Sequence, residues 1–296
     1  RKTACSEPRV ELAVTFDCPI RVWAQRTPHA LALGFGSRRW TYREIDGDVS
    51  RAVSVLTRHG IGAGDRVMIQ SKNRPEIVIL FHALARLSAT LVPLNPRLTA
   101  FETKRVCDRI HPKMILTEAE LDSLCDGPAS SLPARVDENA RAVVLLTSGT
   151  AGTPKVVELS HSNFRNAARV NAKNLGSDPS QCWLGTLPLF HVGGLALIHR
   201  VAEYGASVML EPDFDADRSL ALMREAITHA SVVPTMLHRM IHGAASAPLQ
   251  SMQAILVGGG PVSPELMIQS RSAGLPVLQT YGLTEACSQV ATESLE

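Results

Sequence analysis

The sequence predicts an α/β fold built on mainly parallel sheets. Short apolar runs recur along the chain, and their length and composition are typical of strands that are buried on both faces. Amphipathic or apolar helical patterns separate most of these runs, as they do when helices connect parallel strands. No internal repeat and no low-complexity tract interrupts this alternation.

Helix start signals place the elements of the first 120 residues. Thr41 and Glu44 form a capping box, which predicts a helix that ends near Gly60. Pro75 stands at a first helical position, before the apolar run IVILFHALARL. A second capping box at Thr99 predicts a helix to about Ile110. The strands expected between these helices are 66–70, 90–93 and 113–117.

The same alternation returns after residue 140. Glycine, proline and serine cluster between Ser123 and Glu138, so we expect a loop or a connection between subdomains near 123–140. The strands expected beyond it are 142–146, 182–188, 206–210, 231–233, 254–257 and 276–279.

Composition excludes several classes of protein. The 296 residues hold 30 basic and 28 acidic side chains, a balance that argues against a dedicated nucleic-acid binder. Six cysteines without a CxxC pair are too sparse for a disulfide scaffold, so we expect reduced thiols and a cytoplasmic location. The first ten residues have no apolar signal core, and the run at 77–87 is too short and too polar to span a membrane.

The stretch TSGTAGTPK, from Thr147 to Lys155, has the composition of a phosphate-binding loop. Glycines after a buried strand allow successive N–H groups to point into one concavity, and Lys155 adds a charge. The loop residues that carry this chemistry are Thr147, Ser148, Gly149, Thr150, Gly152, Thr153 and Lys155. The spacing does not fit a Walker A loop. The other interpretation is a polar hairpin in which 156–159 pairs with 142–146, and the two interpretations are compatible.

Two further stretches follow expected strands. Gly258, Gly259, Gly260 and Pro261 come directly after 254–257, and Ser263 then caps a helix. This strand–turn–helix unit stands where α/β proteins bind ligands, although it is not GxGxxG. In QTYGLTEACSQ, from Gln279 to Gln289, an aromatic ring, a hydroxyl and a carboxylate suited to Mg²⁺ follow a strand. The alternative for this stretch is a core tyrosine beside a helix with a glutamate in its first turn.

The fourth stretch is LPLFHVGGLALIHR, from Leu187 to Arg200. His191 follows a strand, and a lone histidine there is more often a hydrogen-bonded core residue than a ligand. Arg200 stands on an otherwise apolar helix, where an unpaired buried guanidinium would be costly. We therefore regard Arg200 as the stronger candidate for a binding role.

Together and in this order, the four stretches resemble the adenylate-forming superfamily of acyl-CoA synthetases, luciferases and peptide-synthetase adenylation domains. The resemblance covers nearly the whole chain and implies two mainly parallel sheets flanked by helices. More narrowly, LPLFHVGG, VGGGPVSPEL and QTYGLTEACSQVATES are similar to the o-succinylbenzoate–CoA ligases of menaquinone biosynthesis. The implied reaction is attack of a carboxylate on ATP to give an acyl-adenylate, followed by displacement of AMP by coenzyme A.

The resemblance also implies a role for each candidate residue. Thr147 to Lys155 resemble the loop that closes on the outer phosphates of ATP, with Lys155 counted among the catalytic residues. The adenine and phosphate contacts would be Gly258, Gly259, Gly260, Pro261, Tyr281, Gly282 and Thr284. Glu285 would bind Mg²⁺, and His191 would stand in the acyl and thiol tunnel as a catalytic and substrate-binding residue. Arg200 would contact the substrate's second carboxylate.

Two departures from the family pattern limit these expectations. Val156 stands where a glycine usually follows the lysine, and the chain stops eleven residues after Glu285. We therefore expect residues 1–296 to be a truncated N-terminal AMP-binding domain without its small C-terminal domain, inactive or strongly impaired alone. The expected partners are a small carboxylic acid, ATP and CoA, and a homo-oligomer is left open. Another aryl or medium-chain acid ligase, or a nucleotide-binding module without turnover, are the alternatives.

Overall fold

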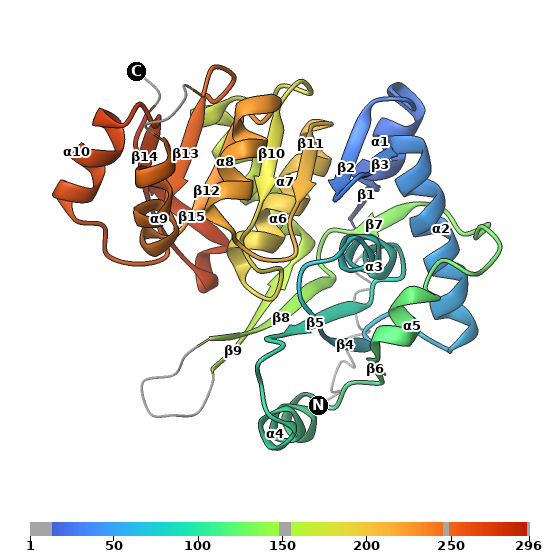
Figure 1. Cartoon of the computed structure of the whole chain (residues 1–296). Helices are drawn as coiled ribbons and strands as arrows, with labels where there is room; N and C mark the ends of the chain where they lie inside the picture. The colour runs from blue at the N-terminus through green and yellow to red at the C-terminus, as the bar shows by residue number, and fades with distance from the viewer. Residues whose placement is uncertain (1–13, 148–154, 245–248, 295–296) are drawn as a thin grey trace, which may run out of the picture.

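The computed structural model describes residues 14–147, 155–244 and 249–294. Within these ranges the strands form a five-stranded sheet, an eight-stranded sheet and a two-stranded pair (Figure 1). The α/β class and the mainly parallel sheets predicted from the sequence are confirmed. The same ranges contain no helix with the length and apolar character needed to cross a bilayer.

The five-stranded sheet has the order β6-β4-β5-β8-β9, and only the pairing of β8 with β9 is antiparallel. Apolar side chains in these strands pack against helices on both faces, as the sequence pattern indicated. The strand bounds are β4 Arg66–Gln70, β5 Thr90–Leu94, β6 Met114–Leu116, β8 Arg141–Thr147 and β9 Lys155–Ser160.

The eight-stranded sheet has the order β15-β14-β13-β12-β10-β11-β2-β3, with antiparallel pairing at its two ends. The parallel core of this sheet runs from β14 to β2. Its bounds are β2 Leu31–Phe35, β3 Arg38–Thr41, β10 Cys182–Gly185, β11 Ser207–Leu210, β12 His229–Val232, β13 Ala254–Val257, β14 Val277–Leu283 and β15 Ser288–Thr292.

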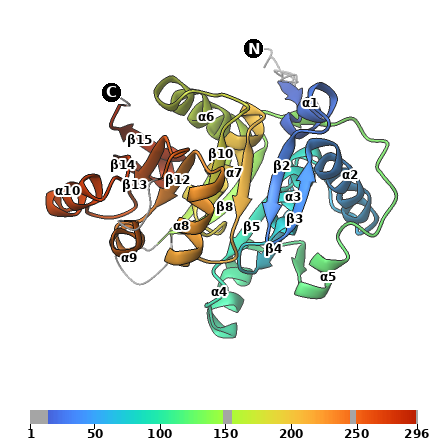
Figure 2. The same ribbon diagram turned by 45° about the horizontal axis from the view of Figure 1, so that its top comes forward.

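Helices separate the two sheets and cover their outer faces (Figures 1 and 2). One buried cluster joins α2, α3, α6 and α7 between the sheets, and two smaller clusters lie under α4 and under α8 to α10. The helix bounds are α1 Pro19–Arg26, α2 Tyr42–Arg58, α3 Pro75–Arg86, α4 Ala100–Ile110, α5 Glu118–Asp122, α6 His161–Leu175, α7 Val192–Tyr204, α8 Ala216–Glu225, α9 Pro234–Ala244 and α10 Pro264–Ser272.

Local signals account for where several helices begin. The predicted capping boxes are present at Thr41 and Thr99, where each hydroxyl accepts from the third helical N–H. Pro75 occupies the first turn of α3 as predicted. The region predicted as a connection has no regular structure from Ser123 to Ala134, and β7 (Arg135–Asp137) then pairs with β1 (Thr15–Asp17). A division of the chain near 123–140 stays a prediction.

The segment after 276–279 differs from the alternative of a core tyrosine beside a helix. Strand β14 continues to Leu283, a 3-10 turn follows at Thr284–Ala286, and β15 returns antiparallel. The Tyr281 side chain is 64% exposed, so it is not a core residue. The continuation depends on Gly282, where a Cβ would come within 2.0 Å of the Ser288 carbonyl oxygen.

Candidate functional site

The carboxyl ends of parallel strands from both sheets surround one cavity of about 580 Å³. Ligands of open α/β sheets bind at such strand ends, so the position itself favours a binding site. The lining includes three cationic side chains from separate segments, Lys72, Arg97 and Arg239, and one of the sequence candidates, His191. Lys72 pairs with Asp213 at 3.0 Å, whereas Arg97 and Arg239 form no ion pair with a described residue.

His191 stands at the N-cap of α7, on the wall of this cavity. The turn before it is tight because a Cβ on Gly194 would meet the Pro188 carbonyl oxygen at 2.4 Å. The ring centroid of Phe190 lies 4.5 Å from that of His191. Neighbouring protein atoms displace water from part of the imidazole, and this desolvation lowers the pKa of His191 below its usual range. The ring is therefore neutral at pH 7 and can accept a hydrogen bond.

The Ser/Thr/Gly stretch lies largely outside the described residues, since these omit Ser148, Gly149, Thr150, Gly152 and Thr153. Its two ends are described, and Thr147 on β8 is paired with Lys155 on β9. The predicted hairpin of 142–146 with 156–159 is thus present. Val156, which departs from the family pattern, packs against the cluster under α4.

The TSGTAGTPK and QTYGLTEACSQ motifs are neighbours in space. Strand β9, which Lys155 begins, contacts the 3-10 turn Thr284–Ala286. The contact places the strand that Lys155 begins beside the turn that carries Thr284 and Glu285. Glu285 is exposed and forms no ion pair with a described residue, so its oxygens are available to a hard cation.

The glycine-rich stretch and Tyr281 follow neighbouring strands, β13 and β14. Gly258 is buried against Thr280, the residue before Tyr281, whereas Gly259, Gly260 and Pro261 are exposed. Gly259 has a φ of 77°, a conformation that disfavours a side chain. An exposed aromatic ring beside exposed backbone forms a surface on which a flat ring can stack.

Arg200 is buried in the interior, 4% exposed, with no carboxylate partner among the described residues. Its Nη2 donates to Oε1 of Gln289 at 2.8 Å, and its guanidinium carbon lies 4.9 Å from the Trp183 ring centroid. The Nε atom has no described hydrogen-bond partner. Burial lowers the pKa of Arg200 to about 10, so the group is still protonated at pH 7. An unneutralised buried cation is a candidate site for an anion.

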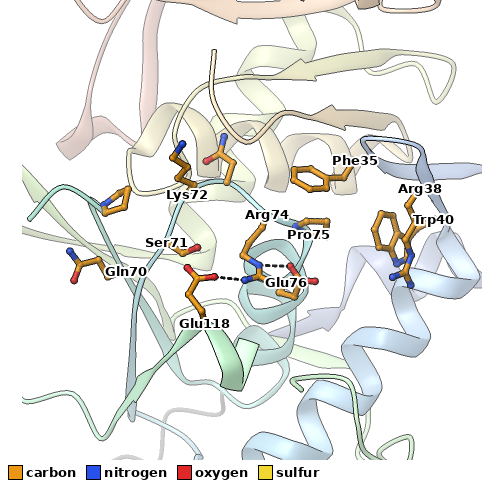
Figure 3. Close-up of a pocket in the computed structure, with 12 residues that line it drawn as sticks. Phe35, Arg38, Trp40, Gln70, Ser71, Lys72, Arg74, Pro75, Glu76 and Glu118 are labelled. Carbon is orange, nitrogen blue, oxygen red and sulfur yellow. Dashed lines mark hydrogen bonds and ion pairs between the residues drawn. The ribbon is translucent and has the colours of Figure 1, made fainter. Parts of the chain in front are cut away.

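A second cavity, of about 680 Å³, adjoins the first and shares Lys72, Asn73 and Pro96 with it. Figure 3 shows Phe35, Arg38 and Trp40 of the β2–β3 hairpin on one side and Arg74 on the other. Arg74 is held by carboxylates, with Nε 2.7 Å from Glu76 and Nη1 2.5 Å from Glu118. Sequence reasoning missed these cavity residues, although Lys72 and Arg97 each come shortly after a predicted strand.

Comparison with known proteins places this geometry in a family. A family model described as AMP-binding enzyme matches residues 20–296. The 2-succinylbenzoate–CoA ligase of Bacillus pumilus is 32% identical over 283 residues, and that of Geobacillus kaustophilus is 34% identical over 284. Both alignments cover 90% of this chain and 58% of the relative. The chain therefore spans a little over half the length of these curated relatives.

Solved structures agree with this assignment. The o-succinylbenzoate CoA synthetase of Bacillus subtilis in complex with ATP and magnesium ion is 30% identical, with a TM-score of 0.88, over 95% of this chain and 62% of that one. The same enzyme in complex with its acyl-adenylate intermediate also gives a TM-score of 0.88, over 95% of this chain and 61% of that one. The chain belongs to the AMP-binding enzyme family.

Proposed function

We propose that this protein is an ATP-dependent acid–CoA ligase that acts through an acyl-adenylate and converts o-succinylbenzoate to o-succinylbenzoyl-CoA. The observation that carries the choice of acid is Arg200, a buried guanidinium without a carboxylate partner among the described residues. The only carboxylate of a monocarboxylic acid is the group that reacts with ATP, so such an acid has no charge left to pair with Arg200. A second carboxylate on the acid would neutralise Arg200 and fix the orientation of the substrate.

The first half-reaction is adenylation. One carboxylate oxygen bonds to the α-phosphorus of ATP while the bond to the β-phosphate bridging oxygen breaks, and pyrophosphate leaves with that electron pair. The carboxylate is already ionised at pH 7, because its reference pKa is about 4, so no general base is needed. The difficulty is the approach of one anion to another, which makes positioning and charge neutralisation the main catalytic terms.

The proposed ATP contacts lie at two places on the eight-stranded sheet and one on its neighbour. The surface formed by Gly259, Gly260, Pro261 and Tyr281 would hold adenine, and Gly282 would keep β15 close behind it. Thr147 ends β8 and Lys155 begins β9, and these two residues would contact the outer phosphates together with Thr284. Ser148 to Thr153 are assigned to the same contact by the sequence motif alone.

Glu285 is the proposed magnesium ligand, and the residue fits that role. It is an exposed carboxylate without an ion-pair partner among the described residues, on a turn that contacts β9. Bound Mg²⁺ would neutralise phosphate charge and orient the pyrophosphate leaving group. The chain's own contribution is a carboxylate on the turn that contacts β9.

The second half-reaction joins the acyl group to coenzyme A. The thiol sulfur bonds to the acyl carbon, the carbon–oxygen bond to AMP breaks, and the thiol proton is released. The neutral ring of His191 on the wall of the 580 Å³ cavity can accept that proton. Arg97 and Arg239 on the same wall would attract the phosphates of coenzyme A.

ATP–pyrophosphate exchange on the purified protein tests this assignment. Exchange should depend on an added acid, and o-succinylbenzoate should support it better than benzoate, a medium-chain fatty acid or the succinylbenzoate monoester that lacks the second charge. Equal exchange with the monoester would indicate that the substrate is another aryl or acyl acid. Binding of AMP without exchange for any acid would favour a nucleotide-binding module.

A further inference from the structure

One neutral oxygen receives two donors beside Arg200. Oε1 of Gln289 accepts from Nη2 of Arg200 at 2.8 Å and from Nδ2 of Asn171 at 2.6 Å. Asn171 is 5% exposed on α6, and Gln289 is half-buried on β15. Gln289 thus links the helices between the sheets to the edge of the eight-stranded sheet, at the guanidinium.

The other end of the same side chain fixes its orientation. Nε2 of Gln289 lies 3.4 Å from Oγ1 of Thr280 and 3.3 Å from Oγ1 of Thr292. The two hydroxyls lie 2.8 Å apart, and Thr280 also donates to the Ala291 carbonyl at 3.1 Å. The Thr280 hydroxyl thus donates to the backbone and the Thr292 hydroxyl donates to Thr280. Both hydroxyl oxygens therefore present lone pairs, not protons, to residue 289. An amide N–H satisfies those lone pairs and a carboxylate oxygen does not.

The neutrality of Gln289 has an electrostatic consequence. A buried guanidinium is stabilised most by a carboxylate, yet its Nη2 donates to an amide oxygen, and no carboxylate among the described residues forms an ion pair with it. The Trp183 ring adds a weak cation–π contact at 4.9 Å. Arg200 is thus oriented by neutral groups and keeps its full charge for an incoming anion.

We propose that Gln289 is a positioning residue whose amide oxygen orients the Arg200 guanidinium without neutralising it, so that this guanidinium can bind the remote carboxylate of the acid substrate. The proposal rests on the function proposed above and adds a specificity determinant to it. It explains why an amide stands at position 289, since a carboxylate there would compete with the substrate from within the protein. Selectivity for a dicarboxylic acid then depends on residue 289 as well as on Arg200.

The test measures the binding of two matched ligands to the full chain. Both are sulfamoyl-adenosine analogues of the o-succinylbenzoyl adenylate, one with the second carboxylate free and the other with it as a methyl ester. The wild-type protein should bind the free acid at least tenfold more tightly than the ester. Gln289→Glu should weaken binding of the free acid at least tenfold and change binding of the ester less than twofold.

Two variants control for charge and for folding. Gln279→Glu makes the same substitution on β14, at an exposed position, and should leave the ratio of the two affinities unchanged. Gln289→Met removes the hydrogen-bond acceptor without adding charge. It should weaken binding of the free acid about threefold to tenfold relative to binding of the ester. Melting temperatures show which variants fold, and the methionine variant decides if the glutamate variant does not.

Each outcome has one meaning. If Gln289→Glu weakens both ligands equally, or neither, residue 289 does not act through the substrate carboxylate and the proposal is wrong. If the wild-type protein binds both ligands with the same affinity, Arg200 does not bind the second carboxylate, and the proposal for Gln289 is wrong as well. If the wild-type protein binds neither ligand, the proposed function itself is wrong.

Discussion

Gly258 and Thr280 are packed so closely that a Cβ on the glycine would come within 2.6 Å of the Thr280 carbonyl oxygen. The contact involves backbone, which has little room to shift between paired strands β13 and β14. Gly258→Ala should therefore destabilise the protein by about 2 kcal/mol, as overpacking does, and weaken AMP binding because Tyr281 follows Thr280. Urea denaturation and calorimetry measure the two effects.

Gly260 provides the matched control for this substitution. A Cβ there would find its nearest neighbours at 3.9 Å, in the ring of Pro234, which is ordinary contact. Gly260→Ala should change the free energy of unfolding by less than about 0.5 kcal/mol. Equal destabilisation by the two alanine substitutions would contradict the packing argument.

Arg200→Gln tests the assigned carboxylate contact. Loss of one charge-assisted hydrogen bond costs about 1.5–3 kcal/mol, so the KM for o-succinylbenzoate should rise roughly 10- to 100-fold. The KM for ATP should change less than threefold, because no proposed nucleotide contact involves Arg200. Arg200→Lys keeps the charge and should give an intermediate value. A parallel rise in both KM values would show that Arg200 does not contact the second carboxylate of the substrate.

The buried His161 predicts a pH dependence of stability. Its side chain is 2% exposed, its Nε2 has no described partner, and burial lowers the pKa of His161 to about 3. In the unfolded chain the imidazole takes a proton near pH 6.5. Below that pH the unfolded state binds more protons, so the free energy of unfolding decreases as the pH falls, by about 1.4 kcal/mol per pH unit for this residue.

His161→Phe should remove that share of the slope. The phenyl ring keeps an aromatic group beside Phe81, whose ring centroid is 6.2 Å from that of His161. Urea midpoints between pH 5 and pH 8 measure the slope, and the exposed His29 serves as the control through His29→Phe. An unchanged slope in the His161 variant would mean that this imidazole does not resist protonation in the folded state.

Arg97 tests the path proposed for coenzyme A. It is exposed on the wall of the His191 cavity, without an ion-pair partner among the described residues. Arg97→Ala should raise the KM for CoA about threefold to tenfold and leave the KM for ATP unchanged, with a larger effect at low salt because exposed charges are screened. Arg105→Ala on α4 removes an exposed arginine outside the cavity lining and should change neither value.

Much of the fold could be predicted because its signals are local. Strands 66–70 and 254–257 agree with β4 and β13 at both ends, and both capping boxes are present. The β2–β3 hairpin was not predicted, since β2 is a short run that contains a glycine and pairs with the distant β11. The continuation of β14 was missed because it depends on the approach of β15 at Gly282, which no local pattern reveals.

The candidate site follows the same division. His191, Arg200 and the glycine-rich stretch stand out in sequence because their residue types are unusual where they occur. The cavity residues Arg97 and Arg239 are ordinary surface arginines until the fold brings their segments together. Gln289 was included in a quoted motif, but its role depends on Asn171 and Arg200, which belong to two different helices.

The pairing of β2 with β11 also bears on synthesis of the chain. On the ribosome, β2 emerges about 175 residues before the strand that covers its open side. At 5–20 residues per second this interval lasts roughly 9 to 35 s. The nascent β2–β3 hairpin therefore presents an unpaired strand edge to other nascent chains for that time. Translation speed and chaperone supply should consequently influence the yield of folded protein.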